Sequence, residues 1–198
     1  MKKEYCVPIL DIPKLSEKSC QEIAEYTQTH LDRFKGYDNI DGKTTELNVP
    51  NLYMGFSYLN LNLTKEDYSF GVYICETNNL RLDYSKNIIF MIQRSKWRIP
   101  PHTDPQRRAS LLFHIKGTAT TKFYTMENHI PNIDYSSVEL KLAQTIKMDM
   151  REWYLFDNRT IHEVELIQDG TRLTFVLDLF DQFVDFNDAR KNYKKIFL

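Results

Sequence analysis

The sequence predicts a mainly β protein: a double-stranded β-helix of the jelly-roll, cupin-like type, with an N-terminal helix packed on one sheet. Phe and Tyr, which favour strands, occur 12 times each among the 198 residues. From residue 87 onward, about eight short strand-like segments follow one another with no helical pattern among them. Apolar residues make up 42% and charged residues 27%, as in ordinary globular proteins.

Residues 1–86 are expected to form an α+β support for the β-rich part. A short strand is predicted over residues 4–10. Ser16 is suited to cap a helix, with Glu17 in its first turn, and Gly36 is expected to end that helix. Helical spacing relates the apolar and small residues between them, which are Cys20, Ile23, Ala24, Thr27, Leu31 and Phe34.

The rest of the N-terminal part has weaker signals. Residues 37–50 are polar and are predicted to form a loop. Residues 51–85 are expected to contain one or two short strands or a helical turn, with Thr64 as a candidate cap.

The jelly-roll core is predicted over residues 87–180, and the charged tail, 181–198, as a short helix. Turn-forming pairs separate several strands, as at Pro100-Pro101, Lys116-Gly117 and Asp169-Gly170. No repeat or linker divides the chain, so residues 1–198 are expected to form a single domain. The predicted strands are 87–95, 97–102, 109–115, 120–126, 138–147, 152–156, 161–167 and 171–180.

Charge and cysteine content restrict the partners and the compartment. The net charge is −1, which provides no general attraction for nucleic acid or an anionic membrane, so we expect neither as a partner. Cys6, Cys20 and Cys75 are far apart and odd in number, which argues against a disulfide framework and favours small buried side chains. The first residues lack the apolar run of a signal peptide, and we expect a cytoplasmic protein.

His102 and Asp104 form the first part of a candidate metal site. Residues i and i+2 of an extended chain point to the same face, and two histidines with one carboxylate commonly hold Fe(II) with open positions. His162 is the best second histidine, because it begins a predicted strand and Arg172 opens the next one ten residues later. Arginine can clamp the carboxylate of an acidic co-substrate.

Other interpretations of these residues remain open. His102 and Asp104 could form local hydrogen bonds in a turn, and His162 could be a buried structural histidine. Arg172 could make a surface salt bridge, for example with Asp169. His30 and His129 have no patterned partner and are expected in loops or at the surface.

The order His-x-Asp, then His, then Arg-x-Thr resembles the Fe(II)- and 2-oxoglutarate-dependent oxygenases, and within them the aspartyl/asparaginyl β-hydroxylase family. The matching segments are 102–105, 156–157, 162–164 and 172–178, and the resemblance extends over about residues 87–182. It implies a double-stranded β-helix oxygenase that uses Fe(II), O2 and 2-oxoglutarate, decarboxylates 2-oxoglutarate to succinate and hydroxylates a carbon.

The resemblance also implies roles for individual residues. Arg172 would pair with the distal carboxylate of 2-oxoglutarate, with the hydroxyl of Thr174 as a helper. His114 would lie near the other carboxylate. Leu112 stands where the family often has arginine, and Arg107 or Arg108 could replace it. The iron would be held, and the chemistry carried out, by His102, Asp104 and His162.

The resemblance suggests an amino-acid-like target carbon, on a free amino acid or a peptide side chain, and the compact size favours a small molecule or short peptide. Retention of Asp104 argues for hydroxylation over halogenation. Two alternatives remain: a cupin-type metal-dependent dioxygenase or isomerase that does not use 2-oxoglutarate, and a non-catalytic jelly-roll binding module. Four arginines near the His-x-Asp segment could form a basic rim for an acidic substrate or a solvated surface; they are Arg94, Arg98, Arg107 and Arg108.

Overall fold

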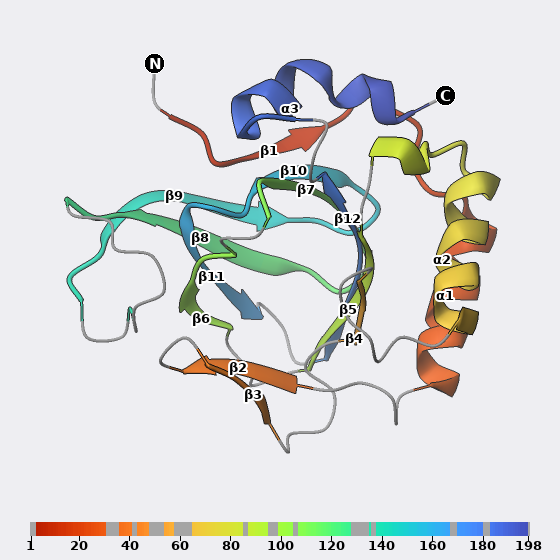
Figure 1. Ribbon diagram of the computed structural model, residues 1–198, viewed down its shortest axis with the longest axis horizontal. Helices are drawn as coiled ribbons and strands as arrows, with labels where there is room; N and C mark the ends of the chain where they lie inside the picture. Colours follow the sequence, from red (N-terminus) through yellow and green to blue (C-terminus); the bar gives the residue numbers. More distant parts are fainter. Residues whose placement is uncertain are drawn as a thin grey trace.

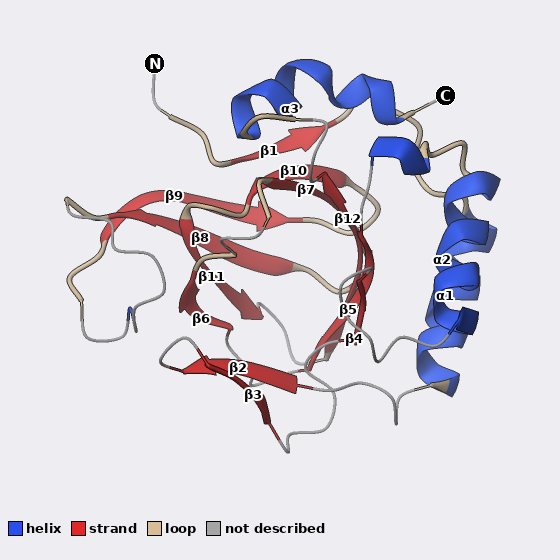
Figure 2. Cartoon of the chain, in the orientation of Figure 1, coloured by secondary structure: helices blue, strands red, loops and turns tan. Residues whose placement is uncertain are grey.

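The protein is built around two antiparallel sheets that face each other, as the computed structural model shows (Figures 1 and 2). The predicted mainly β, jelly-roll fold is therefore confirmed. The structure describes residues 3–30, 36–40, 43–47, 54–57, 65–84, 87–94, 99–104, 107–127, 135, 138–166, 170–179 and 183–197.

The larger sheet has six strands in the order β1-β10-β7-β12-β5-β4, and the smaller sheet has four in the order β6-β11-β8-β9. Successive strands from β5 to β12 alternate between the sheets, except that β8 and β9 pair with each other in the smaller one, which is the winding of a jelly roll. The larger sheet comprises β1 (Cys6–Ile9), β4 (Met54–Ser57), β5 (Asn87–Arg94), β7 (Ala109–Lys116), β10 (Trp153–Asp157) and β12 (Thr171–Leu179). The smaller comprises β6 (Ile99–His102), β8 (Ala119–Thr125), β9 (Lys141–Met148) and β11 (Ile161–Leu166).

Strand β12 lies inside the larger sheet, and both of its faces are buried. Alternate residues point to opposite faces. Phe175 packs outward in a cluster that includes Ile23 and Ile74, whereas Val176 packs in a second cluster with Phe123 of the smaller sheet. Even-numbered residues of β12 therefore face the interior between the sheets; they are Arg172, Thr174, Val176 and Asp178.

Two helices, α1 (Glu17–Thr29) and α2 (Lys65–Thr77), lie side by side on the outer face of the larger sheet (Figure 1). The predicted packing of an N-terminal helix on one sheet is confirmed. Ser16 caps α1 as expected, because its side chain accepts a hydrogen bond from the Ser19 N–H at 3.1 Å. No described helix has the length and apolar character needed to cross a membrane.

Helix α1 ends at Thr29, so the prediction that Gly36 ends this helix is wrong. The side chain and main chain of His30 both bond to the Tyr26 carbonyl, with Nδ1 at 2.8 Å, and so satisfy a terminal acceptor there. Gly36 instead begins β2 (Gly36–Ile40), which pairs with β3 (Lys43–Leu47) as an antiparallel hairpin.

The loop predicted over residues 37–50 is also wrong, because this hairpin occupies most of it. Its sequence signal is the pair Asp41-Gly42 between the two strands, which favours a two-residue hairpin turn. Residues 51–85 contain a short strand, β4, as expected. In place of the expected helical turn they contain a full helix, α2. The candidate cap, Thr64, lies outside the described residues. The C-terminal tail contains the expected short helix, α3 (Phe186–Asn192), followed by a 3-10 turn (Tyr193–Ile196).

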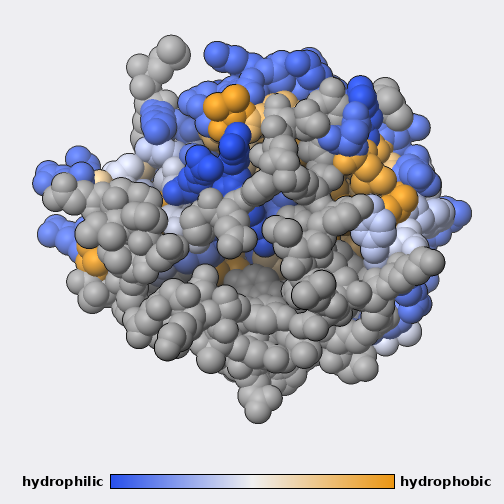
Figure 3. Space-filling model, in the orientation of Figure 1, coloured by the Kyte–Doolittle hydropathy of each residue, from blue (hydrophilic) through white to orange (hydrophobic). Residues whose placement is uncertain are grey.

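The described surface on the face shown in Figure 3 is mostly hydrophilic, with small separate hydrophobic groups. The large apolar side chains that are exposed in the described chain are scattered along the sequence, which is normal for a globular protein. The three cysteines are buried free thiols.

The side chain of Gln144 holds β1 against β9. Its Oε1 accepts hydrogen bonds from the Tyr5 and Cys6 N–H groups at 2.7 and 3.1 Å, and its Nε2 donates to the Cys6 carbonyl at 2.8 Å. Because β1 belongs to the larger sheet and β9 to the smaller, one amide joins the two sheets at this end of the barrel.

Replacing Gln144 with alanine is expected to lower the free energy of unfolding by about 2 kcal/mol, because it leaves buried main-chain groups without their acceptor and donor. Urea unfolding followed by tryptophan fluorescence measures this change. Thr145→Ala, on the exposed face of the same strand, is the control and should change stability by less than about 0.5 kcal/mol. Equal stabilities for the two variants would contradict the assigned role of the amide.

Candidate metal centre

The structure brings His102, Asp104 and His162 together at the junction of β6 and β11. His102 ends β6 and is the direct cross-strand partner of His162, and their ring centroids lie 4.3 Å apart. One ligand atom from each of the three residues lies within 4.8 Å of the others, and His162 Nε2 is 4.0 Å from Asp104 Oδ2. This cluster could hold a metal ion.

Two prolines help to place His102. Pro100 and Pro101 occupy β6, which is an edge strand of the four-stranded sheet, where the missing N–H donors are tolerated. Beyond His102 the chain leaves the sheet, and the Asp104 N–H donates to the Asn158 carbonyl at 2.8 Å. His102 and Asp104 are thereby held beside the turn that leads into β11.

His162 is oriented and kept neutral by its surroundings. Its Nδ1 lies 2.8 Å from the Thr160 carbonyl, which can only accept, so Nδ1 carries the proton and Nε2 presents its lone pair toward Asp104. The ring packs edge-on against Phe156, with centroids 4.7 Å apart. Burial and the neighbouring His102 lower the pKa of His162 to about 3, as suits a metal ligand.

Asp104 remains ionised, with its side chain 28% exposed. Burial alone would raise the pKa of this carboxyl. The positive Arg107, the two imidazoles and a hydrogen bond from Asn158 outweigh that effect and hold the pKa well below its usual value. The cluster therefore offers an anionic oxygen of Asp104 and a neutral imidazole nitrogen of His162 as candidate ligands at neutral pH.

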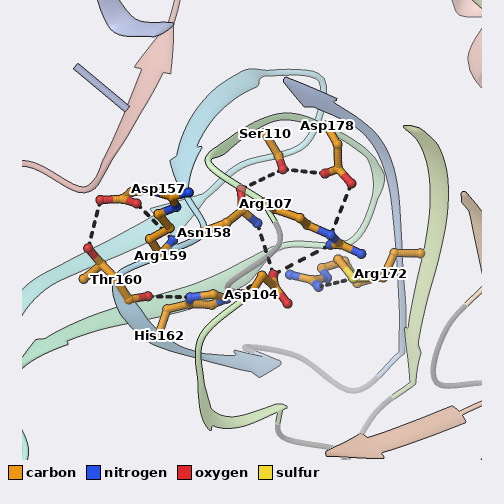
Figure 4. A network of polar contacts seen from close by, with 11 residues as sticks. Asp104, Arg107, Ser110, Asp157, Asn158, Arg159, Thr160, His162, Arg172 and Asp178 are labelled. Atoms are coloured by element: carbon orange, nitrogen blue, oxygen red, sulfur yellow. Dashed lines mark hydrogen bonds and ion pairs between the residues drawn. The ribbon is translucent and has the colours of Figure 1, made fainter. Parts of the chain in front are cut away.

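A second polar group lies on the inner face of the larger sheet. Thr174 of β12 is paired across the ladder with His114 of β7, and Thr174 Oγ1 lies 3.3 Å from His114 Nδ1. Arg172, only 1% exposed, precedes them on the same face of β12, and its Nη2 lies 3.7 Å from the Met91 sulfur. Figure 4 shows the Arg172 side chain pointing from β12 into the interior, toward Asp104 in that view.

The surroundings of His114 are equally buried. Its Nε2 lies 3.2 Å from the Met148 sulfur, and burial together with the positive Arg172 lowers the pKa of His114 well below its usual value. Gly117, in the turn after β7, has φ +75°; a Cβ there would lie 2.8 Å from the Thr171 carbonyl oxygen and 3.1 Å from the Arg172 Cα. Only glycine therefore lets this turn pass against the start of β12.

The stability of the metal-free protein is expected to fall as the pH is lowered below about 6.5. His162 and His114 stay neutral in the folded state because burial lowers both pKa values, whereas both take up a proton in the unfolded chain. The unfolded state then binds more protons, so acid favours unfolding down to the folded pKa of His162, about 3. Urea unfolding at pH 7, 6 and 5 measures the slope, which His114→Gln should reduce; an unchanged slope would contradict a neutral buried His114.

The remaining sequence candidates are placed differently. Arg107 contacts Asp104, with Nη1 3.7 Å from Oδ2, whereas Arg108 donates to the Phe183 carbonyl at 3.0 Å and so bonds to the C-terminal segment. Leu112 faces the interior in an apolar cluster. Trp153 and Tyr154 are buried aromatics. Other candidates lie outside the residues or side chains that the structure describes; they are Arg94, Arg98 and His129.

Sequence reasoning missed the polar residues that support Asp104, namely Asn158, Ser110 and Asp178. Asn158 Nδ2 donates to Asp104 Oδ2 at 3.1 Å, and Ser110 and Asp178 are completely buried behind it. A signal did exist for Asp178: it lies six residues after Arg172 in an otherwise apolar strand, an even spacing that puts both charges on one face.

Comparisons with known proteins show a similarity in fold alone. No protein-family model and no curated protein match the chain. Among solved structures, AviO1 from Streptomyces viridochromogenes Tue57 is similar with a TM-score of 0.50 and 10% identity, with 91% of each chain covered. A mutant of Bacillus subtilis oxalate decarboxylase OxdC gives a TM-score of 0.37 at 13% identity, covering 50% of this chain and 22% of that one.

The chain thus spans less than a quarter of the length of oxalate decarboxylase. Together, the sheet order and the three-residue cluster define a cupin-like jelly roll with side chains that could hold a metal ion.

Proposed function

We propose that this protein is an Fe(II)- and 2-oxoglutarate-dependent dioxygenase similar to the aspartyl/asparaginyl β-hydroxylases. It would hydroxylate a C–H bond of an amino-acid-like substrate, either a free amino acid or a peptide side chain. The observation that supports this most strongly is the meeting of His102, Asp104 and His162 in a barrel whose interior also contains the buried cation Arg172.

The residues of the cluster fit Fe(II). Two imidazoles and one carboxylate on one side of an ion are the ligand set of non-haem Fe(II) oxygenases, and they leave positions open for other ligands. The hydrogen bond from His162 Nδ1 to the Thr160 carbonyl is the outer contact that a metal-binding histidine usually makes. With Asp104 ionised and His162 neutral, both are ready to bind a cation without first losing a proton.

O2 would be the oxidant, and Fe(II) with 2-oxoglutarate would activate it: one atom of O2 enters succinate, CO2 is released, and the other atom becomes the product hydroxyl. The chain's own residues would bind and orient the reactants. Arg172, deep in the interior, would pair with the distal carboxylate of 2-oxoglutarate, and a buried guanidinium is well suited to hold such an anion. Phe156 beside His162 would help to exclude water from the reacting groups.

The second candidate is a cupin-type metal-dependent dioxygenase or isomerase that does not use 2-oxoglutarate. Contacts inside the barrel favour this candidate. His114 Nδ1 lies beside Thr174 Oγ1 and His114 Nε2 beside the Met148 sulfur, so both ring nitrogens have partners within the protein and need none from a co-substrate. The metal cluster is common to both candidates, so the use of 2-oxoglutarate is the property that separates them.

Anaerobic addition of 2-oxoglutarate to the Fe(II) protein distinguishes the candidates. A visible metal-to-ligand charge-transfer band is expected, followed by slow iron- and O2-dependent formation of succinate when air is admitted. If succinate forms but the charge-transfer band does not appear, the turnover takes place outside this site. If neither the band nor succinate appears, the first proposal is overturned. A screen of free amino acids and short peptides for a gain of about 16 mass units, one oxygen atom, would then identify the substrate.

A further inference from the structure

A closed ring of polar contacts lies behind Asp104 (Figure 4). Asn158 Nδ2 donates to Asp104 Oδ2 at 3.1 Å, and Asn158 Oδ1 lies 2.7 Å from Ser110 Oγ. Ser110 Oγ lies 2.6 Å from Asp178 Oδ1, and Asp178 Oδ2 is 3.2 Å from Arg107 Nε. Arg107 Nη1 returns to Asp104 Oδ2 at 3.7 Å. We call these four supporting residues and Asp104 the aspartate ring.

The ring joins segments that are far apart in sequence. Asp104 and Arg107 lie in the segment after β6, and Ser110 is the second residue of β7. Asn158 lies in the turn between β10 and β11, and Asp178 lies near the end of β12. The same turn residue, Asn158, also accepts the Asp104 N–H through its carbonyl at 2.8 Å. Asp104 is therefore held at its main chain and at its carboxylate by one neighbour.

Burial restricts the orientations that the members of the aspartate ring can adopt. The Ser110 and Asp178 side chains are fully buried, while that of Arg107 is 36% exposed. Buried polar groups cost free energy unless they are bonded, so each member restricts the orientation of the next. Ser110 has one hydroxyl proton and can donate to only one of its two oxygen neighbours at a time, which couples the Asn158 branch to the Asp178 branch.

We infer that Asn158, Ser110, Asp178 and Arg107 are positioning residues that fix the carboxylate of Asp104 opposite the imidazoles of His102 and His162 before a metal ion binds. The inference rests on the proposed metal site and goes beyond it, because it assigns a role to Ser110 and Asp178, which connect to Asp104 through Asn158 and Arg107. Loss of a residue that orients a metal ligand typically weakens metal binding 10- to 100-fold.

The test is a Co(II) titration of the metal-free protein, followed by visible absorption. Ser110→Ala and Asp178→Asn are each expected to weaken Co(II) binding about 10-fold or more and to change the Co(II) spectrum at saturation. Ser110→Thr, which keeps a hydroxyl at this position, should bind Co(II) about as tightly as the wild type. The double variant Asp178→Asn/Arg107→Gln should lose less affinity than the two single losses added together, because both changes break the Arg107–Asp178 contact.

A matched control separates positioning from stability. Ser19 is also fully buried and accepts a hydrogen bond from the Asn78 amide at 2.8 Å, but it lies in α1 on the outer face of the larger sheet. Ser19→Ala should lower the melting temperature as Ser110→Ala does, yet leave Co(II) affinity and the Co(II) spectrum unchanged.

Three outcomes count against the proposals. Wild-type Co(II) binding in folded Ser110→Ala and Asp178→Asn, with binding lost in Asp104→Ala, would overturn the aspartate ring and leave the metal site standing. Additive losses in the double variant would also overturn the ring. Wild-type binding in Asp104→Ala would remove the metal site itself, and the positioning role with it.

Discussion

His162→Leu is expected to weaken Fe(II) binding by more than about 100-fold, beyond the loss typical of a residue that only supports a ligand. His162 presents Nε2 to the cluster, and leucine fills a similar volume beside Phe156 without offering a ligand atom. Anaerobic Fe(II) titration measures the affinity, and the succinate assay should show no iron-dependent turnover.

The control for this variant is His30→Ala. His30 also bonds to a main-chain carbonyl through Nδ1, but at the end of α1 and against Tyr26. This variant should keep the wild-type Fe(II) affinity. If His162→Leu folded and bound Fe(II) as tightly as the wild type, the metal would lie elsewhere and the assignment of all three ligands would be wrong.

Arg172→Met is expected to raise the KM for 2-oxoglutarate about 100-fold, since breaking a buried charge pair costs about 3 kcal/mol. The value of kcat should change less, and Fe(II) affinity should be unchanged, because Arg172 is not among the three candidate ligands. Methionine keeps the length of the side chain and suits the neighbouring Met91 sulfur. Succinate formation at increasing 2-oxoglutarate concentration measures the effect.

Thermal unfolding provides a second measurement that does not depend on turnover. The metal-loaded wild type should gain melting temperature when 2-oxoglutarate is added, and Arg172→Met should not. Arg108→Met, which loses only the bond to the Phe183 carbonyl, should keep the response to 2-oxoglutarate. An equal gain in all three proteins would rule out Arg172 as the partner of 2-oxoglutarate, and no gain in any of them would favour the alternative function.

The jelly roll could be predicted from the sequence because its signals are local. Each strand of the core carries its own pattern of aromatic and branched residues, and turn pairs such as Lys116-Gly117 separate them. The β2–β3 hairpin was missed because its strands are polar, and only Asp41-Gly42 indicated a turn. The end of α1 depends on how His30 bonds to the preceding turn, which spacing does not reveal.

The cluster of His102, Asp104 and His162 could be anticipated because residue type and order limit the choice of metal ligands. The aspartate ring could not. It depends on β12 lying beside β7, which brings Asp178 opposite Ser110, and on the turn at Asn158 reaching the segment after β6. Such neighbours are set by strand order, and no local pattern encodes which strands become adjacent.

The two prolines of β6 have a further consequence for association between molecules. An exposed sheet edge can recruit a strand from another chain, which leads to aggregation. Pro100 and Pro101 supply no N–H groups along this edge, so an incoming strand would find few partners there. The protein can therefore place His102 on an edge strand of its smaller sheet, as the described strands are ordered, without offering that edge as a template for self-assembly.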